Sequence, residues 1–309
     1  MMHLFNKKGR RDAGRLGFTL IELLVVVAII GVLAAILMPV IAKSRNKANR
    51  NLDLNNMKNQ VNAFTMFSND QNGRYPWLMY LREGTAAISY LSPGGGGAWR
   101  YEWDSLLDIR RLHQSRAIQD ALKSAKLVSS PCDPGAALKN TEECLPSRNF
   151  FGWEGKMNKA TPEGKKNHGW KRKEIDERAQ SYSICFGADV LKGEKGIILL
   201  TRNHGGKWNS GYEYKYLGDT LKYGGRTARR KGMVNLEKAD GWLDPDTLPP
   251  NRMRDAVMGL RANEGQMAFC DGSAKMASNE DFKEAIKEHK KTDAGLLKVP
   301  NFNTARPRH

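Results

Sequence analysis

The sequence predicts an α+β protein in which one long N-terminal helix packs on an antiparallel β-sheet head with large loop insertions. Three features predict this fold: a continuous apolar block at 18–42, an amphipathic helical pattern directly after it, and an Asp-Gly turn between two short apolar runs near the C-terminus. The expected parts are a cleaved basic leader, a membrane helix, its amphipathic continuation, and a globular head with a basic, mobile tail, at 1–17, 18–42, 43–73 and 74–309.

The apolar block is long enough to cross a bilayer as a helix, for which about 20 apolar residues suffice. Its one ionisable side chain is that of Glu22. A carboxylate in hydrocarbon costs on the order of 2 to 3 kcal/mol and usually marks a function. Pro39 lacks an N–H and clashes with the preceding turn, so we expect the helix to bend or locally unwind there. The alternative is a kink that the membrane helix simply tolerates.

The basic segment before this block differs from an ordinary secretory signal, whose shorter apolar core is followed by a small-residue cleavage site. Here the basic segment ends at Gly17, and the plausible cut precedes the apolar block. Such a cut would leave the helix on the mature chain and give Phe18 a free amine one helical turn from Glu22. A neighbouring subunit's amine could reach the same carboxylate. Four further cations follow the apolar block, at 43–50. Because both ends of the block are therefore flanked by positive charge, charge alone does not predict which end of the membrane helix is cytoplasmic.

The boundary between leader and helix reads Arg15-Leu16-Gly17-Phe18-Thr19-Leu20-Ile21-Glu22. This run resembles the class III signal of type IV pilins and type II secretion pseudopilins. The resemblance implies a pilin-like fold, cleavage after Gly17 by a membrane aspartic peptidase, and N-methylation of Phe18. It also implies assembly through Glu22, the fifth residue of the mature chain, and a helix break at Pro39.

The same resemblance implies a structural subunit rather than an enzyme, and it does not distinguish a type II secretion pseudopilus from a type IV pilus. Its expected partners are the prepilin peptidase, other pilin or pseudopilin subunits, the lipid bilayer, and a membrane assembly platform with a cytoplasmic ATPase. The expected location is the bacterial inner membrane, crossed once, with the N-terminus cytoplasmic and the head periplasmic or extracellular.

The helix is expected to continue beyond the membrane. Leu54, Met57, Val61 and Phe64 are spaced by three, four and three residues, which places them on one helical face, and the polar run at 69–73 ends the pattern. Together the two segments predict a helix of about 50 residues whose second half packs on a sheet.

Two further regions of the head predict strands. Residues 181–202 contain two short apolar runs separated by a polar Gly-rich segment, which is typical of consecutive strands. Near the C-terminus, Asp271-Gly272 between 266–270 and 273–276 predicts a hairpin, because this dipeptide tolerates positive φ angles. Helices are expected at 115–126 and 279–291.

Three short motifs occur in order in the head: Ser130-Pro131-Cys132-Asp133-Pro134, Ser181-Tyr182 and Phe269-Cys270-Asp271-Gly272. They resemble the Cys-Pro loop, the Ser-Tyr strand and the terminal Asp-Gly hairpin of large pilin-like proteins of planctomycetes and related bacteria. That group often has a histidine ten residues before the aspartate, where this chain has Arg261.

The four cysteines all follow the apolar block, where an oxidising compartment would permit disulfides. Cys132 and Cys144 form the most plausible pair because they close a short loop, and reduced or structural cysteines are the alternative. No Cys-x-x-Cys spacing points to zinc. Asp240, Asp244 and Asp246 could supply oxygen ligands to calcium, although their spacing is not that of an EF-hand and a solvated acidic loop is the alternative. No other cofactor is expected.

The net charge of +17 favours anionic partners, or else a solvated basic surface. Basic and aromatic residues interleave at 207–216, a composition that could stack bases or sugars or could form a strand with aromatic packing. The alternative function is therefore a membrane-tethered or minor-pilin binding module whose basic head captures DNA, glycan or another envelope component. His168 and His204 lie in no spacing typical of catalysis.

Overall fold

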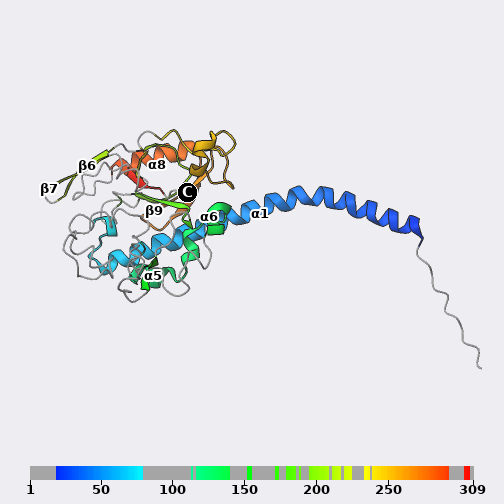
Figure 1. The fold of residues 1–309 in the computed structure, drawn as a ribbon, viewed down its shortest axis with the longest axis horizontal. Helices are drawn as coiled ribbons and strands as arrows, with labels where there is room; N and C mark the ends of the chain where they lie inside the picture. The colour runs from blue at the N-terminus through cyan, green and yellow to red at the C-terminus, as the bar shows by residue number, and fades with distance from the viewer. Residues whose placement is uncertain are drawn as a thin grey trace, which may run out of the picture. The chain divides into compact units, whose positions relative to one another are not determined.

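The computed structural model places much of the chain, which divides into two compact units, Met1–Lys47 and Ala48–His309 (Figure 1). Each unit is described by itself. The structure describes residues 19–78, 113, 116–139, 152–154, 171–173, 179–185, 188, 195–208, 211–216, 219–224, 233–236, 239–291 and 303–306.

Helix α1 runs from Leu20 to Asp70 over 51 residues, which confirms the predicted long N-terminal helix. It ends where the polar run predicted. Asn72 and Gly73 adopt positive φ angles of 55° and 77°, and the Gly73 amide donates to the Ser68 carbonyl at 2.7 Å. This bond satisfies one of the carbonyls that a helix end leaves without an intrahelical partner.

The expected local unwinding at Pro39 is not seen, because α1 continues through this residue as helix. A proline removes one backbone hydrogen bond, but the residues on both sides of Pro39 remain helical. The role of Pro39 in assembly stays a prediction.

In the second unit, α1 buries one face, as its periodicity predicted. Met57, Val61 and Phe64 are fully buried, whereas Leu54 is half-buried. The helix also buries three polar residues that the pattern did not indicate, and these are Asp53, Gln60 and Ser68.

The head contains a seven-stranded sheet in the order β10-β9-β4-β3-β11-β8-β5, in which every neighbouring pair is antiparallel. The predicted α+β class is therefore confirmed. The predicted consecutive strands at 181–202 are β3 and β4. In chain order the strands are Tyr182–Cys185 (β3), Ile197–Thr201 (β4), Lys207–Trp208 (β5), Met233–Asn235 (β8), Gly265–Phe269 (β9), Ala274–Ala277 (β10) and Asn303–Ala305 (β11).

Two small sheets accompany it. They pair β1 (Gly152–Glu154) with β2 (Lys171–Lys173), and β6 (Gly211–Tyr216) with β7 (Asp219–Gly224). The basic and aromatic segment at 207–216 is thus divided between β5 and β6. Its side chains lie outside the described residues, so binding of nucleic acid or glycan there stays a prediction.

The prediction of a mobile basic tail is wrong for residues 303–306. Strand β11 lies between β3 and β8 in the middle of the sheet, with Thr304 opposite both Cys185 and Val234. Arg306, directly after it, is 1% exposed. A short polar strand can join a sheet when its neighbours supply the backbone hydrogen bonds, and such pairing leaves no periodic signal in its own sequence.

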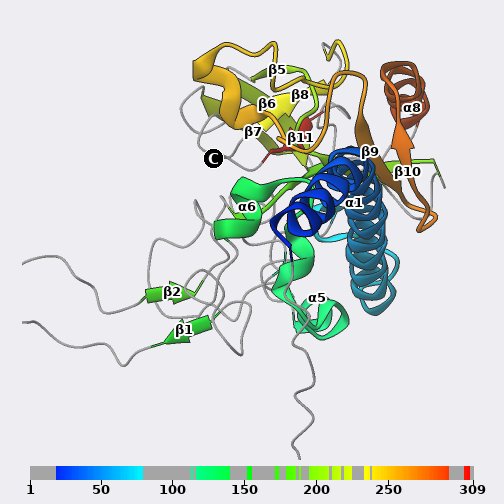
Figure 2. The ribbon, with the colours of Figure 1, turned by 90° about the vertical axis from the view of Figure 1, so that its right-hand side faces the viewer.

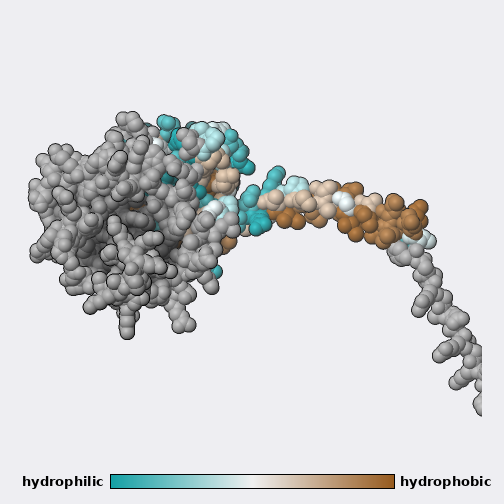
Figure 3. Space-filling view, viewed as in Figure 1, coloured by the Kyte–Doolittle hydropathy of each residue, from teal (hydrophilic) through white to brown (hydrophobic). Residues whose placement is uncertain are grey.

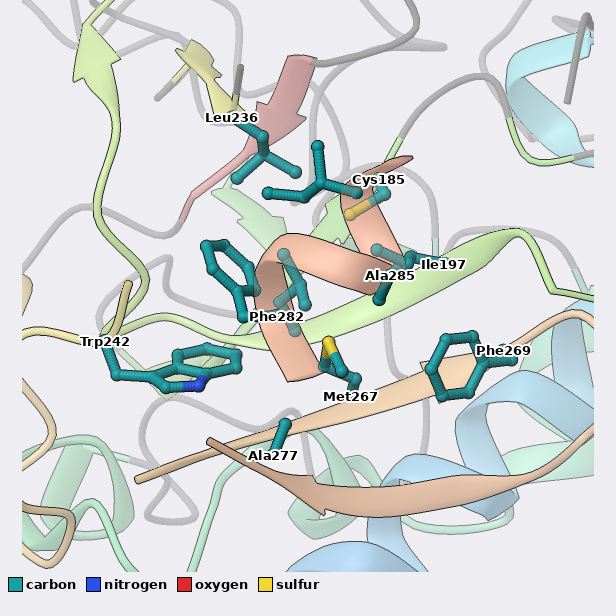
Figure 4. Close-up of a cluster of buried hydrophobic side chains, with 11 residues drawn as sticks. Cys185, Ile197, Leu236, Trp242, Met267, Phe269, Ala277, Phe282 and Ala285 are labelled. Atoms are coloured by element: carbon teal, nitrogen blue, oxygen red, sulfur yellow. The ribbon is translucent and has the colours of Figure 1, made fainter. Parts of the chain in front are cut away.

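The sheet lies between α1 and α8, the predicted C-terminal helix, which spans Asn279–Lys291 (Figure 2). Successive side chains of a strand point to opposite faces of the sheet, so neighbouring residues of one strand can contact different helices. On β9, Gln266 donates to the Arg50 carbonyl of α1 at 3.2 Å, whereas Met267 belongs to the core on the α8 side, with Phe282 (Figure 4). Trp242 closes this core, its ring centroid 4.6 Å from that of Phe282.

The shorter helical elements differ from the single helix expected at 115–126. Helix α5, Arg116–Leu122, stops where Lys123 takes a positive φ of 58°. The Ser124 side chain then caps a 3₁₀ turn, η2, at Ala125–Val128. The remaining elements are η1 (Pro76–Leu78), α6 (Pro134–Lys139) and η5 (Pro250–Asp255).

The predicted hairpin is formed by β9 and β10, with Ala274 opposite Ala268. The Phe269 amide donates to the Ser273 carbonyl at 2.9 Å, and the Gly272 amide donates to the Phe269 carbonyl at 3.0 Å. Gly272 has a φ of 81°, as predicted, whereas Asp271 is not among the described residues of positive φ. Met276 lies on β10, the edge strand of the sheet, and is 41% exposed.

Replacing Gly272 with valine should destabilise the head by about 1 to 2 kcal/mol, because a β-branched residue can adopt a positive φ only with steric strain in the backbone. A Cβ at this position would meet only the Asn62 Oδ1, at an ordinary 3.6 Å, so packing adds little. The measurement is the melting temperature of a fragment beginning at Asn46. Gly272→Asn, which tolerates this conformation better, is the matched control. A valine variant that melts with the wild type would contradict the turn assignment.

Candidate functional site

The described N-terminus is a reciprocal cap on α1. The Thr19 amide and hydroxyl both donate to Glu22 Oε2, at 2.8 and 2.7 Å, while the Glu22 amide donates to Thr19 Oγ1 at 3.3 Å. This is the capping-box arrangement, in which a hydroxyl residue and a Glu three positions later satisfy each other's backbone donors. The spacing Thr-x-x-Glu is the sequence signal of this cap, and it lies within the longer motif at 15–22.

Beyond this cap, every described side chain of the first unit is exposed. Leu20 is 81% exposed and Met38 is 71% exposed. Of the described residues, one helix, α1, is long and apolar enough to cross a membrane, and its most apolar stretch lies near the N-terminus. Figure 3 shows the hydrophobic colouring of this stretch giving way to hydrophilic colouring along the helix. Gly17 and Phe18, the predicted cleavage site, lie outside the described residues.

In the head, a buried carboxylate of α1 meets the sheet. The Tyr182 hydroxyl, on β3, donates a short hydrogen bond to Asp53 Oδ1, and both residues are buried, at 2% and 0% exposure. Burial raises the pKa of Asp53 to about 7; hydrogen bonds from Tyr182 and Ser130 oppose this shift, and the Asp133 carboxylate adds to it. Burial, followed by the charge of Asp53, likewise raises the pKa of Tyr182 well above its usual value.

A second buried carboxylate lies beside the first. Asp133 accepts two hydrogen bonds from the Arg202 guanidinium, from Nε at 2.6 Å and from Nη2 at 2.9 Å. The Ser181 hydroxyl donates a third, at 3.0 Å. Such a two-bond pairing fixes the carboxylate in one plane and compensates the buried charges. Asp133 and Ser181 belong to two of the three head motifs, which the fold therefore brings together.

Further hydrogen bonds attach α1 to the same region. Asn56 donates to the Ser129 carbonyl at 3.3 Å, and Gln60 donates to the Leu127 carbonyl at 2.8 Å. Arg50 pairs with Glu264 at 2.5 Å. The third motif also reaches α1, because the Gly272 turn lies against Asn62. We call the set Asp53, Ser130, Asp133, Ser181, Tyr182 and Arg202 the head anchor.

The sequence did not predict the head anchor. Its residues are far apart in the chain, with Asp53 and Tyr182 separated by 129 positions, so no local spacing connects them. One available signal was an acidic residue on the otherwise apolar face of the amphipathic helix. A buried carboxylate needs compensating partners, and its position on that face indicates that the sheet supplies them.

His204 is buried in a second polar cluster. Its Nδ1 lies 2.8 Å from the Gly205 carbonyl, and its Nε2 lies 2.9 Å from the Ser183 hydroxyl. Burial and the nearby Arg306 lower its pKa well below the usual value, which keeps the ring neutral. The Ser183–His204 distance is that of a nucleophile and a base, but both side chains are 0% exposed, so no substrate can meet them in this conformation. Arg306 also donates to the His204 carbonyl, which fastens the end of β11.

The remaining predicted site residues lie apart from the head anchor or outside the described part of the chain. Cys132 is a free, buried thiol whose pKa burial raises to about 12, with a further contribution from Asp53. Cys144 lies outside the described residues, so the proposed disulfide stays a prediction. Cys185 and Cys270 are likewise buried, and neither forms a disulfide with another described residue.

The three aspartates considered for calcium do not form a cluster. Asp244 Oδ1 accepts from the Asp246 amide at 3.1 Å, while Asp246 pairs with Arg261, the residue that replaces the histidine of the resembling group. Asp240 is exposed. Within the described ranges, no group of three or more His, Cys, Asp or Glu side chains could hold a metal ion. Calcium binding at these residues therefore stays a prediction.

Comparisons with known proteins concern the N-terminal segment. Residues 13–38 match the prokaryotic N-terminal methylation motif, and this range contains the predicted cleavage site and the cap at Thr19 and Glu22. The chain is 35% identical over 71 residues to type II secretion system core protein G of Pectobacterium carotovorum subsp. carotovorum. That alignment covers 23% of this chain and 45% of the relative, so the chain spans less than half of the length of that protein. No solved structure matches the chain.

Proposed function

We propose that this chain is a member of the type IV pilin and pseudopilin family and a structural subunit assembled into a filament through α1. Its match to the N-terminal methylation motif and its similarity to a type II secretion core protein support this proposal. The filament would be a type II secretion pseudopilus or a type IV pilus-like fibre. The observation that carries the proposal is the segment of α1 at 20–42, an exposed apolar helix whose one ionisable side chain, that of Glu22, lies inside the matched motif. Such a surface needs a bilayer or other subunits to cover it.

Processing is the first step of this function. The prepilin peptidase would cut after Gly17 and leave Phe18 as the methylated terminus of a chain that crosses the bacterial inner membrane once, with the head outside the cytoplasm. The leader carries five cations and one acidic residue, and its removal frees the amine that Glu22 can bind. An assembly platform with a cytoplasmic ATPase would then move the subunit into the filament.

The geometry of Glu22 supports a contact between subunits. Its Oε2 is occupied by the two donors of Thr19, while Oε1 makes no hydrogen bond with any residue in the ranges that the structure describes. A neighbouring Phe18 amine could bind Oε1 without displacing the cap. A charge-assisted hydrogen bond of this kind stabilises an interface by about 1.5 to 3 kcal/mol.

The substitution Glu22→Gln should show whether assembly depends on the negative charge of Glu22 or on its hydrogen bonds in the helix cap. Glutamine preserves the capping box but removes the negative charge, so we expect normal insertion and a yield of crosslinked oligomers at least tenfold below wild type at equal protein level. Glu22→Ala should lose both cap and charge, and its yield should be no higher.

The intact mass of the membrane-extracted protein provides the control, since all three proteins should begin at Phe18. Wild-type oligomer yield from Glu22→Gln would show that Glu22 only caps the helix. Chains that retain Met1 in cells with an active prepilin peptidase would contradict the proposed processing.

A further inference from the structure

Three cations follow the apolar part of α1 within the first unit. Lys43, Arg45 and Lys47 are all exposed, and none forms an ion pair with any residue of the described ranges. Arg50, in the second unit, differs because Glu264 already neutralises it. These three residues therefore carry positive charge that no described carboxylate compensates.

Their position along α1 matches the thickness of a bilayer. At a rise of about 1.5 Å per residue, Lys43 lies about 32 Å along the helix from Glu22, and the hydrocarbon core of a bilayer is about 30 Å thick. With Glu22 at one face of the membrane, the three cations reach the head groups of the other. Lys43 and Lys47 are four residues apart and share one side of the helix, while Arg45 lies on the opposite side.

The sequence around these three cations contains no acidic residue that could neutralise their positive charge. No acidic residue occurs between Glu22 and Asp53, and Asp53 is buried in the head. The cleavage proposed above would remove the five leader cations. The Phe18 amine would then be the positive charge left at the leader end of the span, and Glu22 would lie one helical turn from it, whereas no such carboxylate lies beside the three cations on the head side.

We propose that Lys43, Arg45 and Lys47 form a binding surface for the phosphate groups of anionic lipids in the leaflet on the head side. The inference rests on the proposed membrane span of α1. Exposed ammonium and guanidinium groups beside a membrane bind anionic head groups, each favouring them by about fivefold, the equivalent of about 1 kcal/mol. The contact sets the depth of the subunit in the bilayer and must be broken when the subunit enters a filament.

The test uses the mature chain, from which the basic leader has been removed, reconstituted in vesicles of phosphatidylcholine mixed with phosphatidylglycerol. Spin-labelled forms of each lipid give their relative association constants with the protein. We expect wild type to prefer phosphatidylglycerol by about fivefold, and the variant Lys43→Gln/Arg45→Gln/Lys47→Gln to show a preference near one. The matched control removes the same charge from exposed lysines of the head, as Lys126→Gln/Lys283→Gln/Lys287→Gln, and should retain the wild-type preference.

The outcomes separate this inference from the proposed function. A wild-type chain that alkaline carbonate extracts from these vesicles would contradict the membrane span itself. A chain that inserts but shows no preference for phosphatidylglycerol, or a triple variant that keeps the wild-type preference, would overturn the lipid surface alone. Displacement of phosphatidylglycerol by duplex DNA at equal phosphate concentration would also overturn it, because the surface would then belong to nucleic acid.

Discussion

Replacing Asp133 with alanine is expected to lower the free energy of unfolding of the second unit by about 3 to 5 kcal/mol, because it leaves the buried Arg202 guanidinium without its counter-charge. The two side chains are 1% and 5% exposed, so water cannot replace the lost carboxylate. The Ser181 hydroxyl would lose its acceptor in the same change. This penalty would be among the largest that a single substitution produces.

Asp246→Ala is the matched control, because it breaks an Asp–Arg pair that is 68% and 57% exposed. An exposed pair stabilises a protein by about 1 kcal/mol or less. Chemical denaturation of the fragment that begins at Asn46 would compare the two variants by their midpoints. Equal destabilisation by both would mean that burial of the Asp133–Arg202 pair does not matter, and the assignment of the head anchor would be wrong.

The elements that the sequence predicted are those encoded by local patterns. The length of α1 follows from an uninterrupted apolar block joined to a three-four spacing, and its end follows from a polar run that supplies Gly73. The β9–β10 hairpin follows from Asp271-Gly272, whose glycine adopts the expected positive φ. Each prediction depends on residues within a few positions of one another, where backbone preference and burial act together.

The position of β11 and the head anchor depend on distant contacts instead. Strand β11 has no apolar alternation and joins the sheet through hydrogen bonds to β3 and β8. Asp133 and Arg202 are 69 positions apart. The whole fold decides which strands pair and which charges are buried when the partners are so far apart in the chain. The local sequence around these residues therefore predicts only polar loops.

The three head motifs acquire a common physical meaning from the structure. The segment at 130–134 supplies Asp133, the pair at 181–182 supplies Ser181 and Tyr182, and the turn at 269–272 lies against Asn62 of α1. All three therefore hold the second half of α1 to the sheet. In the filament proposed above, this attachment would connect the assembled part of α1 to the head.

The last prediction concerns Asp53, whose substitution by asparagine should make the head more stable above neutral pH. The native pKa of about 7 lies above the usual value of 3.8, so the folded state binds the proton more tightly than the unfolded state. Below pH 4 both states are protonated, and above pH 7 both are ionised. Between these limits the stability from Asp53 falls as the pH rises, by about 4 kcal/mol in all.

Asparagine has the shape of aspartate and can still accept the Tyr182 hydrogen bond, but it cannot ionise. The free energy of unfolding of Asp53→Asn minus that of wild type should therefore increase from pH 4 to pH 8, because only the wild type can ionise at this position. Tyr182→Phe, the control, removes a hydrogen bond that lowers the pKa of Asp53 and should extend the decline to higher pH. Parallel curves for wild type and Asp53→Asn over this range would show that Asp53 does not bind a proton on folding.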